Sequence, residues 1–349
     1  MRIGIIGHFG GYKNFTDGQT VKTLSLYEAL MDSKINDCKI DKIDTFFVKN
    51  NILLFSWHFF KCILFDKKII ALLSINGRKF LFPILYIASK YLGKEVYYYA
   101  IGGRLSCEID KYPKWKKYIS SFSSNWMESE ILVNSLKKKG INNAIFIPNF
   151  KRLSPLDLKD DNKYFTKNIY KFCTFSRVME EKGITDAIKA IKEVHELYMD
   201  YDISLDIYGP IDENYRPDFE KEIKSSNSVC KYCGIVSPNK SVDVLKKYYM
   251  LLFPTHWKHE GIPGTIIDAL MSGLPIIARK WEYCDEMIKD GVTGYTYDFD
   301  NPSKLKETII KSIQNEDCVK KMKKNCLKYA NNYSQEKVLK IICKEMNLK

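Results

Sequence analysis

Long apolar runs are missing from this chain of 349 residues. Its longest uncharged stretches, residues 50–60 and 140–150, are about half the length of a membrane-spanning helix, which needs about 20 residues. The chain starts with Met1 and Arg2 and runs straight into an apolar strand-like segment, without the features of a signal peptide. We therefore expect a soluble, cytoplasmic protein.

A cysteine framework is also missing. Ten cysteines are scattered along the chain, and only Cys230 and Cys233 are closely spaced. A single Cys-x-x-Cys pair is a weak indication of a zinc or redox site. Strand-like alternation around this pair would turn the two sulfurs to different faces, which favours ordinary buried thiols. Ten free thiols are typical of a reducing compartment, in agreement with a cytoplasmic location.

The loop at residues 7–23, GHFGGYKNFTDGQTVKT, is rich in glycine but lacks the G-x-G-x-x-G spacing of a dinucleotide site. A dehydrogenase is therefore disfavoured. Asp17 is predicted to cap a helix that begins near Gln19. The loop is either a flexible connection or a segment that reaches over a ligand held by another domain, and we favour the second. The residues predicted on this side are Gly10, Gly11, Gly18 and Gln19, with Gly103 from a second glycine-containing strand end.

Acidic residues are scarce in the first part of the chain. Residues 1–150 hold 22 Lys or Arg and 12 Asp or Glu, so they carry +10 of the formal net charge of +13. This excess favours an anionic partner: nucleic acid, an anionic membrane face or a phosphorylated acceptor. Residues 111–118, KYPKWKKY, alternate lysines with aromatic side chains. They fit a membrane interface or nucleic acid, or a solvated helix face whose aromatic side chains pack inward.

Two series of alternating strand-like and helix-like segments are present, with a polar stretch between them. Such alternation, with continuous apolar strands, predicts α/β domains with parallel sheets covered on both faces. We predict a first domain at residues 1–150, a linker at 151–168, a second domain at 169–330 and a C-terminal helix at 331–349 that packs back on the first domain. The predicted strands are residues 2–7, 45–48, 69–75, 95–101 and 144–148, then 170–175, 203–208, 229–233, 250–253, 275–278 and 294–297; the main predicted helices are residues 20–31, 51–65, 80–91, 114–122 and 184–197.

The segment from Leu252 to Ala278 carries two carboxylates, Glu260 and Asp268, on either side of a Gly-Ile-Pro-Gly turn. Pro263 suits the first position of a helix, and Gly273 suits its C-terminal cap. Amides at a helix start bind anions, whereas neighbouring carboxylates would repel phosphate unless they face neutral hydroxyl groups. A nucleotide sugar, which has phosphates and sugar hydroxyls in one molecule, satisfies both requirements.

A second anion-binding feature follows the strand that ends at Phe175. Arg177 and Lys182 lie in a strand-to-helix loop, with Gly183 immediately before the next helix. An arginine fork and a lysine charge at a helix start suit a diphosphate. Both features are expected at the carboxyl ends of strands of one parallel sheet, where such sheets bind ligands.

The order of motifs resembles the retaining glycosyltransferases of family 4, also called glycosyl transferases group 1. These motifs are S-R-x(4)-K-G (176–183), I-Y-G-P (207–210), C-G-I-V (233–236), F-P-T followed by E-G-x-P-G-x(3)-D-A-x(3)-G-L-P (253–275), and D-G-x-T-G (290–294). The resemblance is specific over residues 170–300 and looser over the first half. It implies the GT-B fold: two Rossmann-like, doubly wound domains that face an interdomain cleft, the first binding the acceptor and the second the nucleotide-sugar donor.

The resemblance also implies roles for individual residues. Glu260 would contact the transferred sugar, and Asp268 would hold the ribose hydroxyls where the family usually has glutamate. Arg177 and Lys182 would bind the diphosphate. The implied catalytic residues are Glu260, Arg177 and Lys182; the implied donor-binding residues are Arg177, Lys182, Gly234, Ile235, Val236, Glu260, Gly261, Ile262, Pro263, Gly264, Thr265 and Asp268.

The implied reaction is transfer of a hexose, with retention, to a saccharide or lipid-linked saccharide in surface polysaccharide biosynthesis. The basic first domain would attach peripherally to the inner face of the membrane, and no nucleic acid is expected. No metal or other cofactor is expected, because the two cations and the helix start would stabilise the leaving diphosphate. Asp298 and Asp300 are predicted to be solvated or capping residues, and His256 and His259 to lie in a loop without a shared metal.

Two alternatives stay open. A nucleotide-sugar epimerase or phosphorylase of the same fold would have a similar donor site. A basic nucleic-acid-binding protein would explain the net charge but would leave the paired carboxylates and the phosphate-binding loop without a role.

Overall fold

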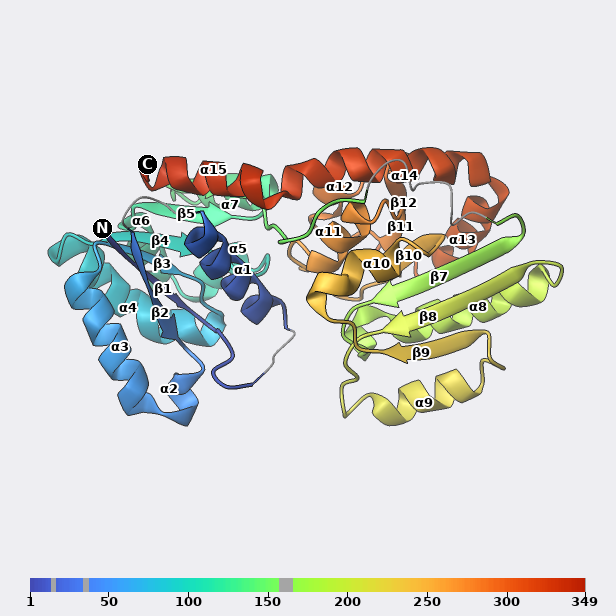
Figure 1. Ribbon diagram of the computed structural model, residues 1–349, viewed down its shortest axis with the longest axis horizontal. Coiled ribbons are helices and arrows are strands. Elements are labelled where there is room, and N and C mark those ends of the chain that lie inside the picture. Colours follow the sequence, from blue (N-terminus) through green and yellow to red (C-terminus); the bar gives the residue numbers. More distant parts are fainter. Residues whose placement is uncertain (14–16, 34–37, 157–165, 349) are drawn as a thin grey trace. The chain divides into compact units, whose positions relative to one another are not determined.

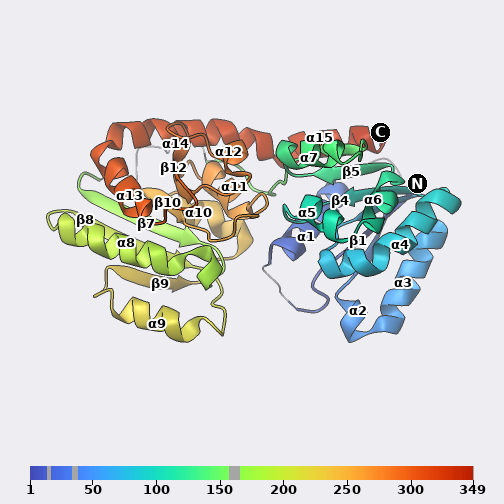
Figure 2. The same ribbon diagram turned by 180° about the vertical axis from the view of Figure 1, so that it is seen from behind.

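The computed structural model describes residues 1–13, 17–33, 38–156 and 166–348. They form two compact units, each built on a six-stranded parallel sheet with flanking helices (Figures 1 and 2). Unit 1 comprises Met1–Arg152 together with Tyr333–Lys349, and unit 2 comprises Leu153–Asn332. The chain therefore completes unit 2 before its last helix returns to unit 1.

The sheet of unit 1 has the strand order β2-β1-β3-β4-β5-β6, and all neighbouring strands are parallel. Its central strands are continuous apolar runs because helices cover both faces, and Ile3, Ile5 and Ile70 are fully buried. Unit 1 contains β1 (Arg2–Gly7), α1 (Gly18–Asp32), β2 (Lys39–Asp44), α2 (Phe47–Asn50), α3 (Ile52–Phe65), β3 (Lys68–Ala71), α4 (Ile75–Tyr91), β4 (Glu95–Tyr99), α5 (Leu105–Lys111), α6 (Lys114–Ser120), β5 (Ser124–Met127), α7 (Glu130–Lys138), β6 (Ala144–Phe146) and α15 (Gln335–Glu345).

Helices α1 and α15 of unit 1 are held by a cap and by core packing, respectively. Asp17 accepts hydrogen bonds from the backbone N–H groups of Gln19 and Thr20 at 3.1 Å, so the predicted cap of α1 is confirmed. At the other end of the chain, Leu339 and Ile342 of α15 lie in the hydrophobic core that also contains Leu26 of α1. The C-terminal helix is thus part of the core of unit 1.

The sheet of unit 2 has the order β12-β11-β10-β7-β8-β9, again with parallel neighbours. The chain runs outward from β7 through β8 to β9, then returns to place β10 on the other side of β7. Parallel sheets bind ligands at such a reversal, beyond the carboxyl ends of the strands. Unit 2 contains β7 (Ile169–Phe175), α8 (Ile184–Leu197), β8 (Asp202–Tyr208), α9 (Arg216–Lys224), β9 (Cys230–Gly234), α10 (Ser241–Leu245), β10 (Met250–Phe253), α11 (Gly264–Met271), β11 (Ile276–Arg279), α12 (Cys284–Met287), β12 (Gly294–Tyr297), α13 (Lys304–Gln314) and α14 (Glu316–Ala330).

The predicted strand at residues 45–48 is wrong. The strand is β2, Lys39–Asp44, and residues 47–50 form the short helix α2. Strand β2 lies at the edge of the sheet and leaves most of its side chains partly exposed, so its sequence KIDKID lacks an apolar run. The prediction also missed β5, which has only four residues. Residues 157–165 of the predicted linker lie outside the described residues.

Candidate active site

The loop after β7 approaches the end of β10 more closely than any side chain would allow. A short 3₁₀ helix, Glu180–Lys182, leads to Gly183, whose φ of +68° is left-handed. A Cβ atom on Gly183 would lie 2.0 Å from the carbonyl oxygen of Pro254, the residue that follows β10. Glycine is therefore required twice, for its backbone conformation and for the close contact. The contact holds Lys182 against the loop that carries Glu260.

Lys182 and Glu260, 78 positions apart in the sequence, form an ion pair. Lys182 Nζ donates to Glu260 Oε2 at 2.5 Å, and the two side chains are only 15% and 16% exposed. Thr255 Oγ1 lies 3.3 Å from the same carboxylate oxygen and is positioned to donate to it. The aromatic rings of Phe253 and Trp257 have their centroids 5.8 Å and 5.6 Å from Lys182 Nζ. Two of the three predicted catalytic side chains thus meet at the reversal between β7 and β10.

Helix α11 begins beside the same strand end. Pro263 is its extended N-cap rather than its first residue, and Gly264 opens the helix, one position later than predicted. Thr265 Oγ1 donates to the carbonyl oxygen of Phe175 at 2.6 Å, which fixes the start of α11 to the end of β7. The first amides of a helix have no carbonyl partner within it and carry partial positive charge. The start of α11 and Lys182 therefore both lie beyond the carboxyl end of β7.

Asp268 lies one turn further along α11 and is 3% exposed. Ser241 Oγ, at the start of α10, donates to its Oδ1 at 3.2 Å. The segment just before α10 is the predicted nucleobase loop, in which Gly234 has a φ of +82° and Ile235 is 60% exposed. Asp268, the carboxylate predicted to hold a ribose, is thus bonded to the helix that follows the loop predicted to seat a base.

A chain of buried hydroxyls supports this edge of the sheet. Tyr248 donates to Asp206 Oδ2 at 2.6 Å, and Tyr208 donates to the hydroxyl oxygen of Tyr248 at 2.7 Å. Burial raises the pKa of Tyr208 to about 12 and raises the pKa of Tyr248 further, with the Asp206 hydrogen bond adding to the effect. Both phenols therefore stay protonated and act as donors. Beside them, Gly209 N–H donates to the carbonyl oxygen of Gly234 at 2.9 Å and joins the two loops.

Arg177 differs from Lys182 in having an exposed side chain. Its guanidinium makes no hydrogen bond or ion pair within the described ranges 1–13, 17–33, 38–156 and 166–348. The group lies two residues beyond the end of β7, on the loop that also carries Lys182. It supplies a second positive charge that Glu260 does not neutralise.

The predicted acceptor-side residues all lie in unit 1, near the carboxyl ends of its strands. Asp44, at the end of β2, accepts from the backbone N–H of Phe9 at 2.9 Å and of Gly11 at 2.7 Å. Gly11 has a φ of +58°, and a Cβ atom there would strike the ring of Phe46. The remaining predicted residues follow β1 or β4: Gly10 in the same loop, Gly18 and Gln19 at the start of α1, and Gly103 after β4. Residues 14–16 of this loop lie outside the described residues.

The other sequence features have ordinary surroundings. Cys230 Sγ contacts the carbonyl oxygen of Ile188, whereas Cys233 interacts with Tyr208, so the two sulfurs face different sides as predicted. His256 Nε2 lies 2.7 Å from Asp186, and His259 Nδ1 lies 2.7 Å from Glu282. Asp298 and Asp300 are both exposed, and neither caps α13, which begins after Ser303. Within the part of the chain that the structure describes, no three His, Cys, Asp or Glu side chains are grouped as metal ligands.

Sequence reasoning missed two residues that hold the carboxylates. Thr255 contacts Glu260, and Ser241 contacts Asp268. Thr255 had a local signal, because a hydroxyl directly after a buried strand faces the carboxyl end of the sheet. Ser241 had none, since its role depends on packing between α10 and α11.

A family model described as "Glycosyl transferases group 1" matches residues 158–332, half of the chain. The chain belongs to this family. Its matched region coincides with unit 2 and contains every predicted donor-binding residue.

The curated relatives match the same part of the chain. An uncharacterized glycosyltransferase of Methanocaldococcus jannaschii, MJ1069, is 27% identical over 153 residues, 43% of this chain and 37% of that protein. A second, MJ1178, is 25% identical over 174 residues, 50% of this chain and 47% of that protein. An uncharacterized 41.2 kDa protein in the cps region of Klebsiella pneumoniae is 24% identical over 177 residues, 51% and 46% of the two chains. Each match spans less than half of the relative's length.

Solved structures match nearly the whole chain. Anabaena Alr3699/HepE, solved in complex with UDP, has a TM-score of 0.74 at 14% identity and covers 99% of this chain and 100% of its own. Sucrose-phosphate synthase from Thermosynechococcus elongatus has a TM-score of 0.76 at 12% identity, with 99% and 98% coverage. At such low identity the likeness concerns the fold alone. The predicted fold class is confirmed: both units are Rossmann-like, as in GT-B glycosyltransferases, while the cleft between them stays a prediction.

Proposed function

We propose that this protein is a retaining, family 4 glycosyltransferase that moves a hexose from a nucleoside-diphosphate sugar to a saccharide or lipid-linked saccharide. The observation that carries the proposal is the Lys182–Glu260 ion pair between the ends of β7 and β10. The pair supports the proposal because a cation suited to phosphate and a carboxylate suited to sugar hydroxyls lie within one hydrogen bond of each other. Relatives support the donor class, since HepE has been solved with UDP and with UDP-glucose.

The proposed reaction exchanges one bond to the anomeric carbon for another. The bond to the diphosphate oxygen breaks, its electron pair leaves with the nucleoside diphosphate, and the acceptor oxygen bonds to the anomeric carbon on the same face. The acceptor proton passes to the leaving phosphate. Lys182, Arg177 and the first amides of α11 stabilise the negative charge that develops on the diphosphate. No metal or other cofactor takes part.

Glu260 would orient the transferred sugar through its hydroxyls, and Asp268 would hold the ribose. Asp268 is buried and bonded to Ser241 at the start of α10. The ribose would therefore lie near the start of α10, and the base would lie beside it on Gly234, Ile235 and Val236. Gly261, Ile262, Pro263, Gly264 and Thr265 would line the path between sugar and phosphates. The acceptor would bind to unit 1 at Gly10, Gly11, Gly18, Gln19 and Gly103.

Acceptor-dependent release of nucleoside diphosphate is the decisive assay. A panel of nucleotide sugars is first screened by thermal shift, and turnover of the donors that bind is then measured with and without saccharide or lipid-linked acceptors. A transferase releases nucleoside diphosphate faster when the acceptor is present. An epimerase converts the sugar without an acceptor, and a phosphorylase needs phosphate, so either result would overturn the proposal. Product analysis by NMR tests retention, and activity after treatment with EDTA tests metal independence.

Matched variants test the site itself. Lys182→Met and Glu260→Gln are each expected to lower kcat by about 10²–10³, the usual effect of removing one group that stabilises transition-state charge. The control is a surface ion pair of the same unit, Lys306–Glu193, with Nζ and Oε2 at 2.7 Å. Lys306→Met and Glu193→Gln should leave kcat within about twofold of wild type. Equal activity in the two sets of variants, with all proteins folded, would refute the assignment.

We further propose a role in surface polysaccharide biosynthesis at the inner face of the cytoplasmic membrane. The matched Klebsiella protein is described as lying in a cps region, and the first 150 residues carry most of the positive charge. Both observations favour an acceptor held at an anionic membrane. The corresponding measurement is transfer to native lipid-linked acceptors in membranes compared with free saccharides.

A further inference from the structure

Helix α3 exposes an unusual amount of apolar surface. Its sequence, ILLFSWHFFKCILF, is apolar on all sides, although only Phe55, Phe59 and Cys62 are buried. Helix α4 of the same unit adds further exposed apolar side chains. Together they form what we call the α3–α4 surface: Ile52, Leu53, Trp57, Phe60, Leu64 and Phe65 from α3, with Phe80, Ile84, Ile87 and Tyr91 from α4, each at least 42% exposed. Contiguous exposure of this kind marks an interaction site.

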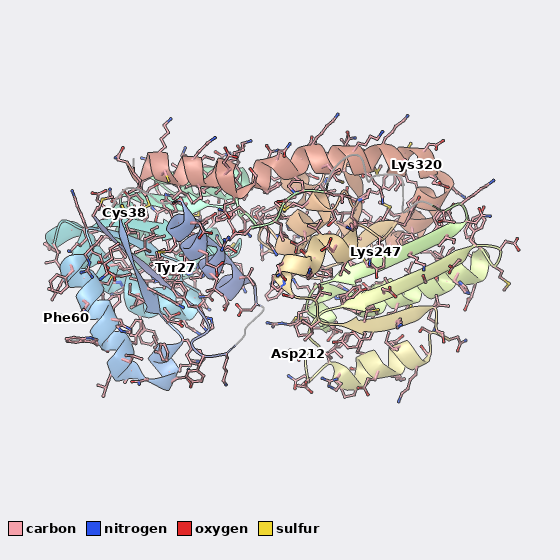
Figure 3. The ribbon with its side chains drawn as sticks, viewed as in Figure 1. Tyr27, Cys38, Phe60, Asp212, Lys247 and Lys320 are labelled. Carbon is pink, nitrogen blue, oxygen red and sulfur yellow. The ribbon has the colours of Figure 1, made fainter. Side chains whose placement is uncertain are left out.

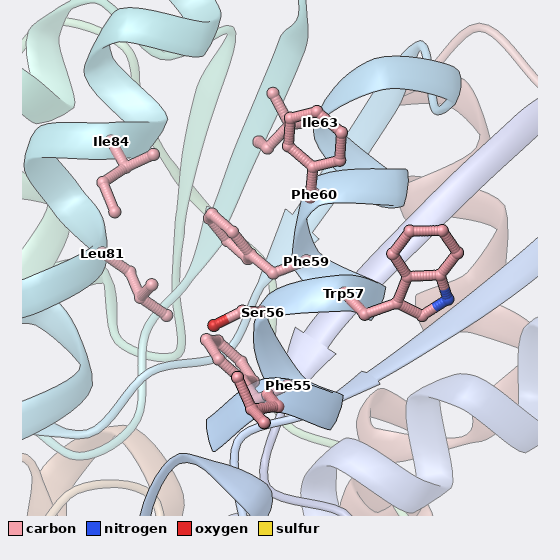
Figure 4. Close-up of a pocket in the computed structure, with 9 residues that line it drawn as sticks. Phe55, Ser56, Trp57, Phe59, Phe60, Ile63, Leu81 and Ile84 are labelled. Atoms are coloured by element: carbon pink, nitrogen blue, oxygen red, sulfur yellow. The ribbon is translucent and has the colours of Figure 1, made fainter. Parts of the chain in front are cut away.

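A groove of about 600 Å³ runs between the two helices (Figure 4). Phe55 and Phe59 lie in it with their rings stacked 5.5 Å apart, and Leu81 and Ile84 line the opposite side from α4. Ser56 is its single polar lining residue. Phe60 projects outward from α3 at the edge of unit 1 (Figure 3). The surface thus combines projecting side chains with an apolar recess between them.

The surroundings of this surface are almost free of negative charge. Residues 45–94 contain a single acidic residue, Asp66, which is fully buried and bonded to Arg2. The same range holds eight basic residues, of which Lys68 and Arg78 are buried in ion pairs with Glu95 and Glu108. The exposed basic residues are Lys49, Lys61, Lys67, Lys79 and Lys90. A basic rim therefore surrounds an apolar centre.

The rim continues onto α6, which packs beside α4. Lys117 of α6 lies over the ring of Tyr86 at 5.4 Å, and Tyr86 contacts Tyr118 at 5.3 Å. Lys79 of α4 lies 5.4 Å from the ring of Tyr112, the residue that follows α5. The segment KYPKWKKY exposes its lysines beside α4, whereas Trp115 is buried and Tyr112 and Tyr118 are partly buried, as in the predicted solvated helix face whose aromatic side chains pack inward. Nucleic acid would use the lysines and the aromatic rings but would leave the exposed aliphatic side chains of Ile52, Leu53 and Leu64 without a partner.

We propose that the α3–α4 surface docks unit 1 on an anionic bilayer, with Trp57 and Phe60 inserted among the acyl chains and the lysines at the phosphate level. Charge decides against a second copy of this chain, because pairing two such surfaces would oppose their basic rims. Aromatic and aliphatic side chains with a basic rim are typical of proteins that lie in the membrane interface. No described helix is long and apolar enough to span a bilayer, so the contact is peripheral. This inference refines the membrane part of the proposed function and does not depend on the donor site.

The test is flotation of the full chain with two kinds of vesicle. One contains phosphatidylcholine alone, and in the other about one lipid in three is the anionic phosphatidylglycerol. We expect binding to the anionic vesicles that weakens with salt. Each basic residue near such a surface is worth about fivefold in partition, so Lys61→Glu with Lys79→Glu should weaken binding by at least about 25-fold. Trp57→Ser with Phe60→Ser should abolish insertion. Brominated lipids should quench fluorescence in wild type but much less in Trp57→Phe.

Matched controls lie in unit 2. Leu197→Ser with Met199→Ser changes two apolar side chains that are at least as exposed as Trp57 and Phe60, and Lys189→Glu with Lys321→Glu reverses two exposed lysines. Both control pairs should bind vesicles like wild type. All variants should turn over donor with a soluble acceptor at the wild-type rate, which separates failure of docking from failure of the proposed enzyme activity.

Three results would overturn the inference. One is a lack of vesicle binding by wild type at low salt. Another is equal loss of binding in the surface variants and the controls. The third is self-association in light scattering that Phe60→Ser removes, because a second copy would then be the occupant.

Discussion

Gly183 offers a sharp test of how the candidate site is assembled. Any other residue there meets two obstacles, a left-handed φ of +68° and a Cβ position 2.0 Å from Pro254 O. The conformation alone costs alanine about 1–2 kcal/mol. Relief of the contact requires the β7 and β10 loops to separate by about 1 Å, for which overpacking data suggest a further 1–3 kcal/mol. Gly183→Ala should therefore destabilise unit 2 by about 2–5 kcal/mol.

Gly291 is the matched control for this substitution. Its φ of +72° is nearly the same, but a Cβ atom there would have no neighbour within 4 Å. Gly291→Ala should thus show the conformational cost alone, about 1–2 kcal/mol. For a unit of this size, 1 kcal/mol corresponds to about 2–4 °C in Tm. Calorimetry should therefore show a much larger fall in Tm for Gly183→Ala than for Gly291→Ala.

Activity extends the comparison from stability to the site. Separation of the two loops would lengthen the 2.5 Å Lys182–Glu260 contact, so Gly183→Ala should also lose acceptor-dependent turnover, while Gly291→Ala keeps it. Equal shifts of Tm in the two variants would refute the reasoning, because they would show that the close contact with Pro254 has no energetic weight.

Two further predictions concern buried charges and thiols. Lys22 Nζ donates to Glu128 Oε1 at 2.6 Å, and the two side chains are only 5% and 8% exposed. Lys22→Met should therefore lower the free energy of unfolding, measured in urea, by about 3–5 kcal/mol, because it leaves a buried carboxylate unpaired. Adding Glu128→Gln to this variant should restore much of the lost stability. Burial raises the pKa of Glu128, so this carboxyl group takes up a proton more readily in the folded protein than in the unfolded chain. The stability lost in Lys22→Met should therefore shrink as pH falls from 8 to 5, because protonation removes the unpaired charge. A loss that stays constant with pH would contradict this account. Burial raises the pKa of Cys230 and of Cys284 to about 12, so alkylation of the native protein at pH 8, followed by mass spectrometry, should label exposed Cys107 and Cys318 long before these two. Early labelling of Cys284 would show that its site opens more readily than the structure indicates.

The positions of the residues predicted to bind the donor could be read from the sequence because each carries a local signal. Arg177 and Glu260 follow apolar strands, and Gly183 precedes a helix, so sequence position alone places them at the carboxyl edge of a parallel sheet. Sequence did not show that Lys182 and Glu260 touch, because that contact depends on the strand order that puts β10 beside β7. The partnership of Ser241 with Asp268 was hidden for the same reason.

The errors of the sequence reading have a common physical cause. Strand β2 is an edge strand in which four of six residues are charged, and the apolar residues that follow it, Phe46 and Phe47, belong to a turn and a short helix. Apolar content was therefore a poor guide where one side of an element faces solvent. Helix α3 shows the converse. A helix that is apolar on all sides is usually buried, yet most of α3 is exposed, and only the structure revealed that its outer surface is not covered by the described residues of the unit.

The Lys182–Glu260 pair also bears on why position 182 carries lysine. An ammonium group has three donor hydrogens, so Lys182 can keep its bond to Glu260 and still donate to a phosphate oxygen. Arginine would present a planar fork that favours bidentate contact with one anion, and it would draw Glu260 away from the sugar. Exposed Arg177, whose guanidinium Glu260 does not engage, is the better place for such a fork. In the proposed reaction the two cations would therefore differ in role: Lys182 would join the sugar-binding carboxylate to the phosphate, and Arg177 would add the charge that Glu260 cancels at Lys182.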